Sequence, residues 1–320
     1  MVIDDKTYAA NKLNKMACSE YSLKQFRMLN ATLTLNGMAA VIPAVSKLSS
    51  RVIRILGCNP SPMTLQGTNT YIVGTGKRRI LIDTGDANVP QYLNHLQSVL
   101  HDEGIDISHI LISHWHHDHM GGVKDVLELQ EKSGVSLVWK YPGNKEEISN
   151  DATKFHYLKD GQEFHVEGAT VRIMHTPGHT ADHVAFHLLE ENAIFSADCI
   201  LGEGTAVFEN LYDYISSLKK LLGVNSSIIY PGHGNIIKNP KQKIQYYIDH
   251  RIERENQILD ILRHSPCQPF TEMEIVKIIY ADTPEKLWQA AAGSVRHHLI
   301  KLQKENKVDL INNRWQYAML

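Results

Sequence analysis

The sequence has few cysteines, no long apolar run and little net charge. Its four cysteines, at positions 18, 58, 199 and 267, are far apart without paired spacing, which fits a reducing compartment. No apolar run is long enough to span a membrane. The formal net charge is only −2 at pH 7. Overall charge therefore supplies no strong attraction to a polyanion, and any binding of nucleic acid depends on local patches.

What the chain does have is a dense group of potential metal ligands at positions 114–119, which read His-Trp-His-His-Asp-His. The apolar run Ile110-Leu111-Ile112 precedes this group, and Met120-Gly121-Gly122 follows it. This context predicts a buried strand that ends in a tight loop, where successive side chains can converge on one point. A solvated histidine-rich loop, the simplest alternative, would need neither the preceding strand nor the embedded aspartate.

The spacing within this run favours two separate ligand groups. His114 and His116 are two residues apart, so on an extended segment their side chains point the same way. Asp118 and His119 come after the chain has turned, and they can face a second point close by. Imidazole nitrogens combined with a carboxylate suit zinc, and also iron or manganese.

Three more ligand-type residues, His179, Asp198 and His233, each follow an apolar run with the composition of a strand. A Pro-Gly pair directly precedes both histidines, and such a pair fixes a turn and allows the backbone to approach closely. A single histidine after a strand is more often a hydrogen-bonded structural residue than a ligand. Four such strand ends in one chain instead indicate a shared metal centre.

In this order the residues match a known pattern. Together with Asp83, in the Leu-Ile-Asp-Thr-Gly segment at 81–85, the chain resembles the metallo-β-lactamase superfamily at all five of its motifs. The residues that carry the resemblance are Asp83, His114, His116, Asp118, His119, His179, Asp198 and His233. The chain also closely resembles an endoribonuclease of the glyoxalase-II-like branch, in the segments 56–60, 63–71, 196–204 and 276–280. This resemblance starts near Met38 and runs almost to position 320.

The resemblance implies sites for two metals per chain, and zinc is the usual metal. It assigns His114, His116 and His179 to one metal, Asp118, His119 and His233 to a second, and Asp198 to a bridge between them. Two close cations lower the pKa of a shared water, and the resulting bridging hydroxide can attack an electrophile that lies across the pair. Asp118 is therefore interpreted as a catalytic residue as well as a ligand.

Two further residues have open roles. His183, four positions after His179, is interpreted as a proton donor to the leaving group, and so catalytic, as a residue that orients a ligand, or as a structural histidine. Asp83 lies outside the ligand set, and it either supports a ligand histidine or caps the end of a strand. His117 and His175 are expected not to be ligands, because their neighbours at alternate positions take those roles.

The implied activity is hydrolysis of phosphodiester bonds in single-stranded RNA, because two metals can stabilise both the entering and the leaving oxygens. Asp198 and His233 are only 35 positions apart, which leaves no room for the long insert of many superfamily nucleases. The main alternative is a thioesterase or glyoxalase-II-like hydrolase, which applies the same metal motif to a carbonyl carbon. A β-lactam hydrolase and a metal-binding scaffold without catalysis fit the sequence less well.

The 320 residues suffice for one large domain and a small one. Periodicity supports a mixed α and β chain, and the resemblance implies an αββα sandwich of two sheets with helices outside. Strands are expected at 52–56, 70–73, 79–82, 110–112, 137–139, 170–174, 184–188, 193–195 and 228–230, and helices at 90–101, 123–132 and 211–222. We expect a disordered N-terminal extension at 1–37, a metallo-β-lactamase domain at 38–250 and a winged-helix-like domain at 251–320.

The C-terminal part of the chain has clear local signals. Thr271 and Glu274 have the spacing of a capping box that opens a helix. Thr283 before Pro284 predicts the start of another helix in the same way. The Asn312-Asn313 pair between two short apolar segments predicts the tight turn of a β-hairpin. Helices followed by a hairpin resemble a winged-helix module.

This module carries the clearest basic candidates for contact with RNA. Arg296, Lys301 and Lys304 lie along one predicted helix, where they either guide a phosphate backbone or form a solvated face. The expected partner is single-stranded RNA, without a membrane and without an obligate protein partner, and a homodimer is compatible with the sequence. The resemblance implies the mitochondrial matrix as the compartment, with the cytoplasm as the alternative.

Overall fold

The computed structural model describes residues 41–130, 137–143, 155–266 and 268–318. The extension predicted at 1–37 lies outside the described residues, as do Cys18 and Cys267. From Pro43 onward the chain forms one compact unit. In the described part of the chain, the strands form two large sheets and one two-stranded sheet.

The first sheet has its strands in chain order from β1 to β7. The strands β1 to β4 pair antiparallel, and β4 to β7 pair parallel. Parallel neighbours cannot be joined by a hairpin, so helices lie between strands of the parallel half of the sheet. The helix α2 (Pro90–Glu103) lies between β4 and β5, and α4 (Val123–Gln130) lies between β5 and β6. The strands are β1 (Val45–Lys47), β2 (Val52–Leu56), β3 (Asn69–Val73), β4 (Arg78–Ile82), β5 (Asp106–Leu111), β6 (Leu137–Lys140) and β7 (Phe155–Tyr157).

The second sheet has the order β12-β11-β10-β9-β8. Its strands are β8 (Glu163–Val166), β9 (Ala169–His175), β10 (Val184–Leu188), β11 (Ala193–Ala197) and β12 (Ile228–Pro231), with a 3-10 turn, η1 (Leu189–Glu191), before β11. β8 to β11 form an antiparallel meander, whereas β11 and β12 pair parallel across α5 (Leu211–Val224). As a result, β9, β11 and β12 run in the same direction, and their C-terminal ends lie on the same side of the sheet.

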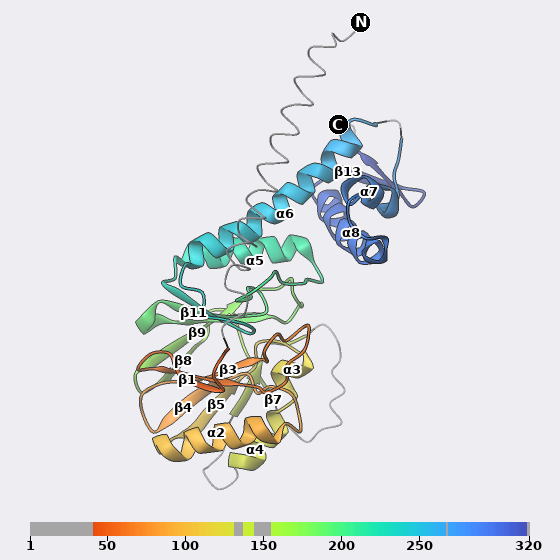
Figure 1. Ribbon diagram of the computed structural model, residues 1–320. Helices are drawn as coiled ribbons and strands as arrows, with labels where there is room; N and C mark the ends of the chain where they lie inside the picture. Colours follow the sequence, from red (N-terminus) through yellow and green to blue (C-terminus); the bar gives the residue numbers. More distant parts are fainter. Residues whose placement is uncertain (1–40, 131–136, 144–154, 267, 319–320) are drawn as a thin grey trace, which may run out of the picture. The chain divides into compact units, whose positions relative to one another are not determined.

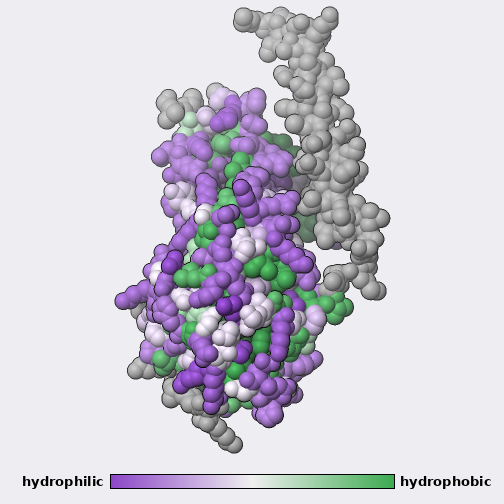
Figure 2. Space-filling model, turned by 90° about the vertical axis from the view of Figure 1, so that its left-hand side faces the viewer, coloured by the Kyte–Doolittle hydropathy of each residue, from purple (hydrophilic) through white to green (hydrophobic). Residues whose placement is uncertain are grey.

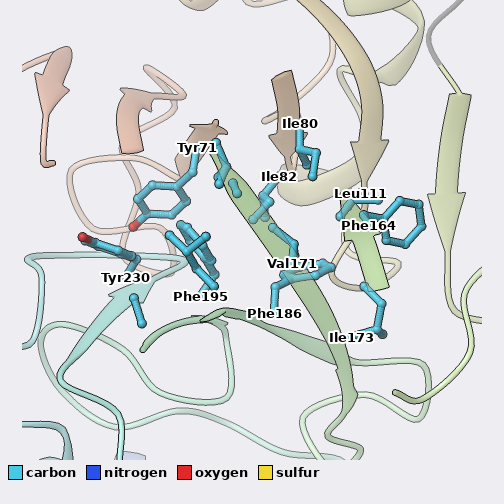
Figure 3. Packing of buried hydrophobic residues seen from close by; sticks show 14 of the residues in the cluster. Tyr71, Ile80, Ile82, Leu111, Phe164, Val171, Ile173, Phe186, Phe195 and Tyr230 are labelled. Carbon is cyan, nitrogen blue, oxygen red and sulfur yellow. The ribbon is translucent and has the colours of Figure 1, made fainter. Parts of the chain in front are cut away.

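The two sheets pack face to face over a shared hydrophobic core (Figure 3). The Tyr71 ring of β3 lies 5.1 Å from the Phe195 ring of β11 and 5.7 Å from the Tyr230 ring of β12, between ring centroids. Leu111 and Phe164 belong to the same buried cluster. Burial of such a side chain contributes about 1.5–3 kcal/mol. This core holds the strand ends of both sheets in fixed positions.

Helices cover the outer faces of both sheets (Figure 1). α2 and α4 pack on the first sheet, and α5 and the first half of α6 (Pro240–Arg263) pack on the second. The buried face of α5 has the helical spacing expected from the sequence, with Leu211, Tyr214, Ile215, Leu218 and Leu221. The αββα sandwich of two mixed sheets is therefore confirmed.

The ligand-rich run departs from its predicted local structure. We expected a loop, but α3 (His117–Met120) is a single helical turn. The prediction was wrong because one turn is too short to show apolar periodicity, and because its packing is not visible in the sequence. Gly122, just after α3, lies so close to the Thr84 backbone that an added Cβ would clash with it. The short strands β1, β7 and β8 were also missed.

The C-terminal module follows two of its sequence signals closely. It contains α7 (Glu272–Ile279), a 3-10 turn η2 (Glu285–Leu287), α8 (Trp288–Lys304) and the hairpin of β13 (Val308–Ile311) and β14 (Arg314–Tyr317). Thr271 and Glu274 form the predicted capping box. Asn312 and Asn313 have φ values of 50° and 60°, the left-handed backbone that a tight hairpin turn requires.

One helix start was predicted wrongly. Thr283 and Pro284 do not open α8, because Pro284 has an extended backbone with ψ 132°. The 3-10 turn η2 follows, and the α-helix begins only at Trp288. A proline with φ near −60° fits both the first turn of a helix and an extended segment, so its presence alone does not decide between them.

The predicted domain boundary at residues 250 and 251 falls inside α6. Ile244 and Tyr247, in the first half of this helix, pack with the second sheet and α5. Ile258 and Leu262, in the second half, pack in the core of the C-terminal module. One continuous helix therefore contributes to two cores, and the exact limits of the predicted domains stay a prediction.

The surface has no large apolar area on the face that Figure 2 shows, where hydrophilic residues dominate and hydrophobic ones form separate patches. Scattered apolar residues are normal on protein surfaces. None of the helices in the described ranges combines the length and the apolar character that crossing a membrane requires.

Candidate metal centre

The predicted metal ligands gather where strands of the two sheets end. One predicted ligand lies shortly after the last residue of each of four strands, β5, β9, β11 and β12. The other ligands lie in α3, which follows β5, and at the N-cap of α3. Because β9, β11 and β12 run in the same direction, their C-terminal ends lie together on one side of the second sheet. The structure brings together all of the predicted ligands, namely His114, His116, Asp118, His119, His179, Asp198 and His233.

The first ligand group contains His114, His116, His179 and Asp198, whose ligand atoms all lie within 4.8 Å of one another. His116 Nδ1 lies 2.9 Å from His114 Nε2 and 3.0 Å from His179 Nε2. Asp198 Oδ2 lies 3.6 Å from His179 Nε2. Three imidazole nitrogens and a carboxylate oxygen in this proximity form a donor set that suits zinc.

The second ligand group contains Asp118, His119 and His233. Asp118 Oδ2 lies 3.2 Å from His119 Nε2 and 3.3 Å from His233 Nε2. Asp198 Oδ1 lies 3.3 Å and 3.2 Å from the same two nitrogens. The two oxygens of Asp198 thus face different groups, which is the position of a bridging carboxylate.

Burial and charge divide the histidines into two kinds. Burial lowers the pKa of His116 to about 4 and that of His114 well below its usual value. These rings are neutral near pH 7, which is the form that binds a metal. Burial also opposes charge on His119 and His233, but the nearby carboxylates, with Asp198 the strongest, together outweigh it. The pKa of His233 rises to about 9, and that of His119 rises well above its usual value.

The carboxylates of the cluster are held in the charged form. Burial disfavours their charge, but the imidazoles of His119 and His233 together outweigh it and hold the pKa of both Asp118 and Asp198 below the usual range. Asp198 Oδ1 is buried and has no hydrogen-bond partner among the described residues, although two imidazole nitrogens lie within 3.3 Å. Lone pairs that converge in this way fit cations, so the residues present fit a pair of divalent metal ions.

Asp83 supports the second group from a buried position. Its Oδ2 accepts hydrogen bonds from His119 Nδ1 at 2.7 Å and from Ser113 Oγ at 2.8 Å. Its Oδ1 accepts from the Ser113 backbone N–H at 2.8 Å. The bond to Nδ1 leaves His119 Nε2 free to face the cluster. Asp83 therefore both supports a candidate ligand and caps the chain just beyond β5.

Two further residues, before and at the start of β3, also support the cluster. Thr68 Oγ1 donates to Asp118 Oδ2 at 3.0 Å. Asn69 Nδ2 donates to two backbone carbonyls in the turn 231–234, each at 2.9 Å, and this turn carries His233. Small polar residues before a strand are ordinary turn chemistry, so the sequence signal for this role was weak.

Two backbone features also shape the cluster. The carbonyl of Val207 accepts a hydrogen bond from His179 Nδ1 at 2.8 Å, which directs Nε2 of that ring toward the first group. Gly232 packs so closely that an added Cβ would lie 2.6 Å from Asp198 Oδ1 and 3.0 Å from His119 Cε1. Only glycine fits at this position without displacing either side chain.

The other histidines of the motifs lie outside both groups. His183 is fully buried, and its ring centroid lies 5.2 Å from that of His114. Its Nε2 has no hydrogen-bond partner within the described ranges, and its role as a proton donor stays a prediction. His117 is exposed, and His175 stacks on Tyr141 with ring centroids 4.1 Å apart.

The basic face predicted on the C-terminal module is largely engaged within the protein. Lys301 is only 8% exposed, and its Nζ lies 2.6 Å from Glu255 Oε2. Lys301 is therefore not available to an RNA phosphate, which corrects the prediction at this position. Lys304 Nζ lies over the Tyr212 ring, 3.8 Å from its centroid. Arg296 is exposed.

An αββα sandwich with a His/Asp cluster at its strand ends is the architecture of a metal-binding hydrolase. Residues 63–233 match the family model of the metallo-beta-lactamase superfamily. Residues 271–315 match the beta-lactamase associated winged helix domain. The chain belongs to the metallo-β-lactamase superfamily. The resemblance predicted from the motifs and the C-terminal winged helix are both confirmed.

Similar proteins support the same assignment over most of the chain. The Beta-lactamase-like protein 2 homolog of Drosophila melanogaster is 54% identical over 84% of this chain and 93% of its own length. The Caenorhabditis elegans protein of the same name is 45% identical over 84% and 89%. A solved beta-lactamase domain protein from Burkholderia ambifaria has a TM-score of 0.71 at 16% identity, over 88% of this chain and 96% of its own. At that identity the solved structure shows the fold alone.

Proposed function

We propose that this protein is an endoribonuclease that hydrolyses phosphodiester bonds of single-stranded RNA with the help of bound metals. The observation that carries the proposal is the pair of ligand groups joined by Asp198. Two adjacent cations can balance negative charge on both the entering and the leaving oxygen of a phosphodiester. The resemblance to an endoribonuclease branch, which extends through the C-terminal module, supports RNA as the substrate.

We assign two zinc ions to the cluster, one to each ligand group. Bound there, zinc would lower the pKa of a shared water and offset charge in the transition state. The protein's own residues prepare the site. His114 and His116 offer neutral nitrogens, because burial lowers their pKa values. Asp198 spans both groups, and Asp83 keeps Nε2 of His119 directed at the cluster.

The surroundings of the cluster favour a flexible strand over a bulky folded substrate. Between Asp198 and His233 the chain forms one irregular segment, α5, a short connection and β12, and no inserted domain. Trp115 is 43% exposed, and its ring centroid lies 4.6 Å from that of His116. An aromatic ring beside the ligands offers a stacking surface for any base, which supports weak sequence preference. Attack by water at phosphorus leaves a 5′-phosphate and a 3′-hydroxyl.

The main alternative is hydrolysis of a thioester carbonyl, as in a thioesterase or a glyoxalase-II-like enzyme. The same ligand groups can polarise a carbonyl and prepare water for attack, so the cluster by itself does not choose between phosphorus and carbon. Measuring hydrolysis of an RNA and of a thioester by the same protein distinguishes the two activities.

The test combines end-labelled single-stranded RNA with S-lactoylglutathione as a thioester. We expect internal cuts in the RNA with the wild-type protein, and loss of the cuts with chelator or with His116→Ala or His119→Ala. His117→Ala is the matched control, because His117 lies in the same run but pairs with Asp86 at 2.7 Å instead of joining a ligand group. Intact RNA together with rapid thioester hydrolysis would overturn the nuclease proposal in favour of the alternative.

The proposed partners and compartment also rest on the resemblance to the endoribonuclease branch. Single-stranded RNA is the proposed partner, without a membrane or an obligate second protein, and a homodimer stays compatible with the chain. The proposed compartment is the mitochondrial matrix, with the cytoplasm as the alternative. Fractionation of cells that express the tagged protein would distinguish the two compartments.

A further inference from the structure

The segment 198–210, between β11 and α5, has no helix or strand, yet it makes a defined contact with the metal centre. Within it, the Val207 carbonyl accepts the hydrogen bond from His179 Nδ1. This bond directs His179 Nε2 toward His116 and Asp198. An irregular segment has no ladder of its own, so other elements must satisfy its backbone groups and hold its carbonyls in place.

One face of α6 supplies these contacts. Lys243, Tyr247 and Arg251 are four residues apart, so their side chains lie on the same side of the helix. Lys243 Nζ lies 3.5 Å from a carbonyl oxygen of the segment 202–206. The Tyr247 hydroxyl and Arg251 Nη2 donate to other carbonyls there, at 3.0 Å and 3.1 Å. The row of side chains therefore follows the segment and ends one residue before Val207.

Phe208 fixes the other side of Val207. The Arg251 guanidinium carbon lies 4.7 Å from the Phe208 ring centroid, a cation–π contact. The Tyr214 ring of α5 stacks on Phe208 at 5.3 Å, and the His297 ring of α8 meets its edge at 5.5 Å. Phe208 therefore lies among α5, α6 and α8, and α8 belongs to the C-terminal module.

We propose that Arg251 and Phe208 are positioning residues for the first ligand group. Through them, α6 and the C-terminal module hold the Val207 carbonyl in place, and this carbonyl holds His179 with Nε2 facing the group. The C-terminal module thus acts on the metal centre through packing, apart from any contact that it makes with RNA. The inference rests on the metal binding that the proposed function requires.

The test is metal affinity, which does not depend on the substrate. Arg251→Met keeps the length of the side chain but removes its charge and its donors. Arg254→Met is the matched control, since Arg254 lies on the same helix with its guanidinium 4.2 Å from the Tyr280 ring centroid. Metal-free proteins are titrated with Co²⁺ against a chromophoric chelator. We expect Arg251→Met to weaken binding about 10–100-fold, with a changed visible spectrum of bound Co²⁺, and Arg254→Met to bind as the wild type does.

Phe208 provides a second pair of variants if Arg251→Met does not fold. Phe208→Leu should weaken Co²⁺ binding, whereas Phe208→Tyr, which keeps the ring, should restore it. Wild-type affinity and spectrum in both Arg251→Met and Phe208→Leu would overturn the inference while leaving the proposed function intact. A wild-type protein that takes up no Co²⁺ would overturn the metal-dependent function and this inference together.

Discussion

The exchange Asp83→Asn tests how strongly the candidate metal centre depends on a residue that lies outside both ligand groups. It replaces a buried carboxylate by an amide of nearly equal volume. The carboxylate accepts three hydrogen bonds, from His119 Nδ1, Ser113 Oγ and the Ser113 backbone N–H. An amide has one acceptor oxygen and one donor group, so it cannot accept all three. If the donor group faces His119 Nδ1, the ring proton moves to Nε2, where the metal should bind.

The expected effect has two parts. A hydrogen bond to a charged group contributes about 1.5–3 kcal/mol, and one or two of the three bonds are lost. The free energy of unfolding of the metal-free protein should therefore fall by about 2–4 kcal/mol. A residue that orients a ligand histidine typically changes metal affinity about 10–100-fold, and we expect a loss of this size at the second ligand group.

The assay measures both quantities against a matched control. Guanidinium unfolding in chelator gives the stability, and elemental analysis after dialysis against limiting zinc gives the occupancy. Asp86→Asn is the control, because Asp86 is a nearby carboxylate that pairs with the exposed His117. The reasoning would be refuted if Asp83→Asn kept the metal content and affinity of the wild type and lost no more stability than Asp86→Asn.

Two further changes probe other parts of the structure. Gly232→Ala should abolish full metal occupancy, measured by elemental analysis, because the new Cβ would lie 2.6 Å from Asp198 Oδ1; two metals at normal affinity would contradict this. Lys301→Met should lower the free energy of unfolding by up to about 3 kcal/mol, because it leaves Glu255 buried with Lys307 Nζ, 3.8 Å away, as its remaining ion-pair partner among the described residues. It should not change the salt dependence of RNA binding, and a flatter dependence would restore Lys301 as a phosphate contact.

The strand ends that carry the cluster could be predicted because two simple signals coincide there. Apolar runs mark buried strands, and His or Asp residues directly after them mark positions where side chains leave the core. His179 and His233, each preceded by a Pro-Gly pair, are examples. Such signals are local in the sequence, so they can be recognised without knowledge of the fold.

The supporting contacts could not be predicted because they join distant parts of the chain. Val207 reaches His179 through its backbone carbonyl, which any residue type offers. Thr68 lies 50 positions from Asp118. Lys301 illustrates the opposite error, since a lysine on a helix predicts a solvated charge. Its burial depends on Glu255, which lies on a different helix.

The wide spread of the candidate ligands along the chain has a consequence for the order of folding. The first group takes residues that follow β5, β9 and β11, and the second takes residues of α3 and of the turn after β12. Contacts of such long range form late, after the cost of closing the intervening loops has been met. A partly folded chain therefore has no complete set of ligands. Metal uptake would report the finished native state, and bound metal would in turn stabilise that state against unfolding in proportion to its affinity.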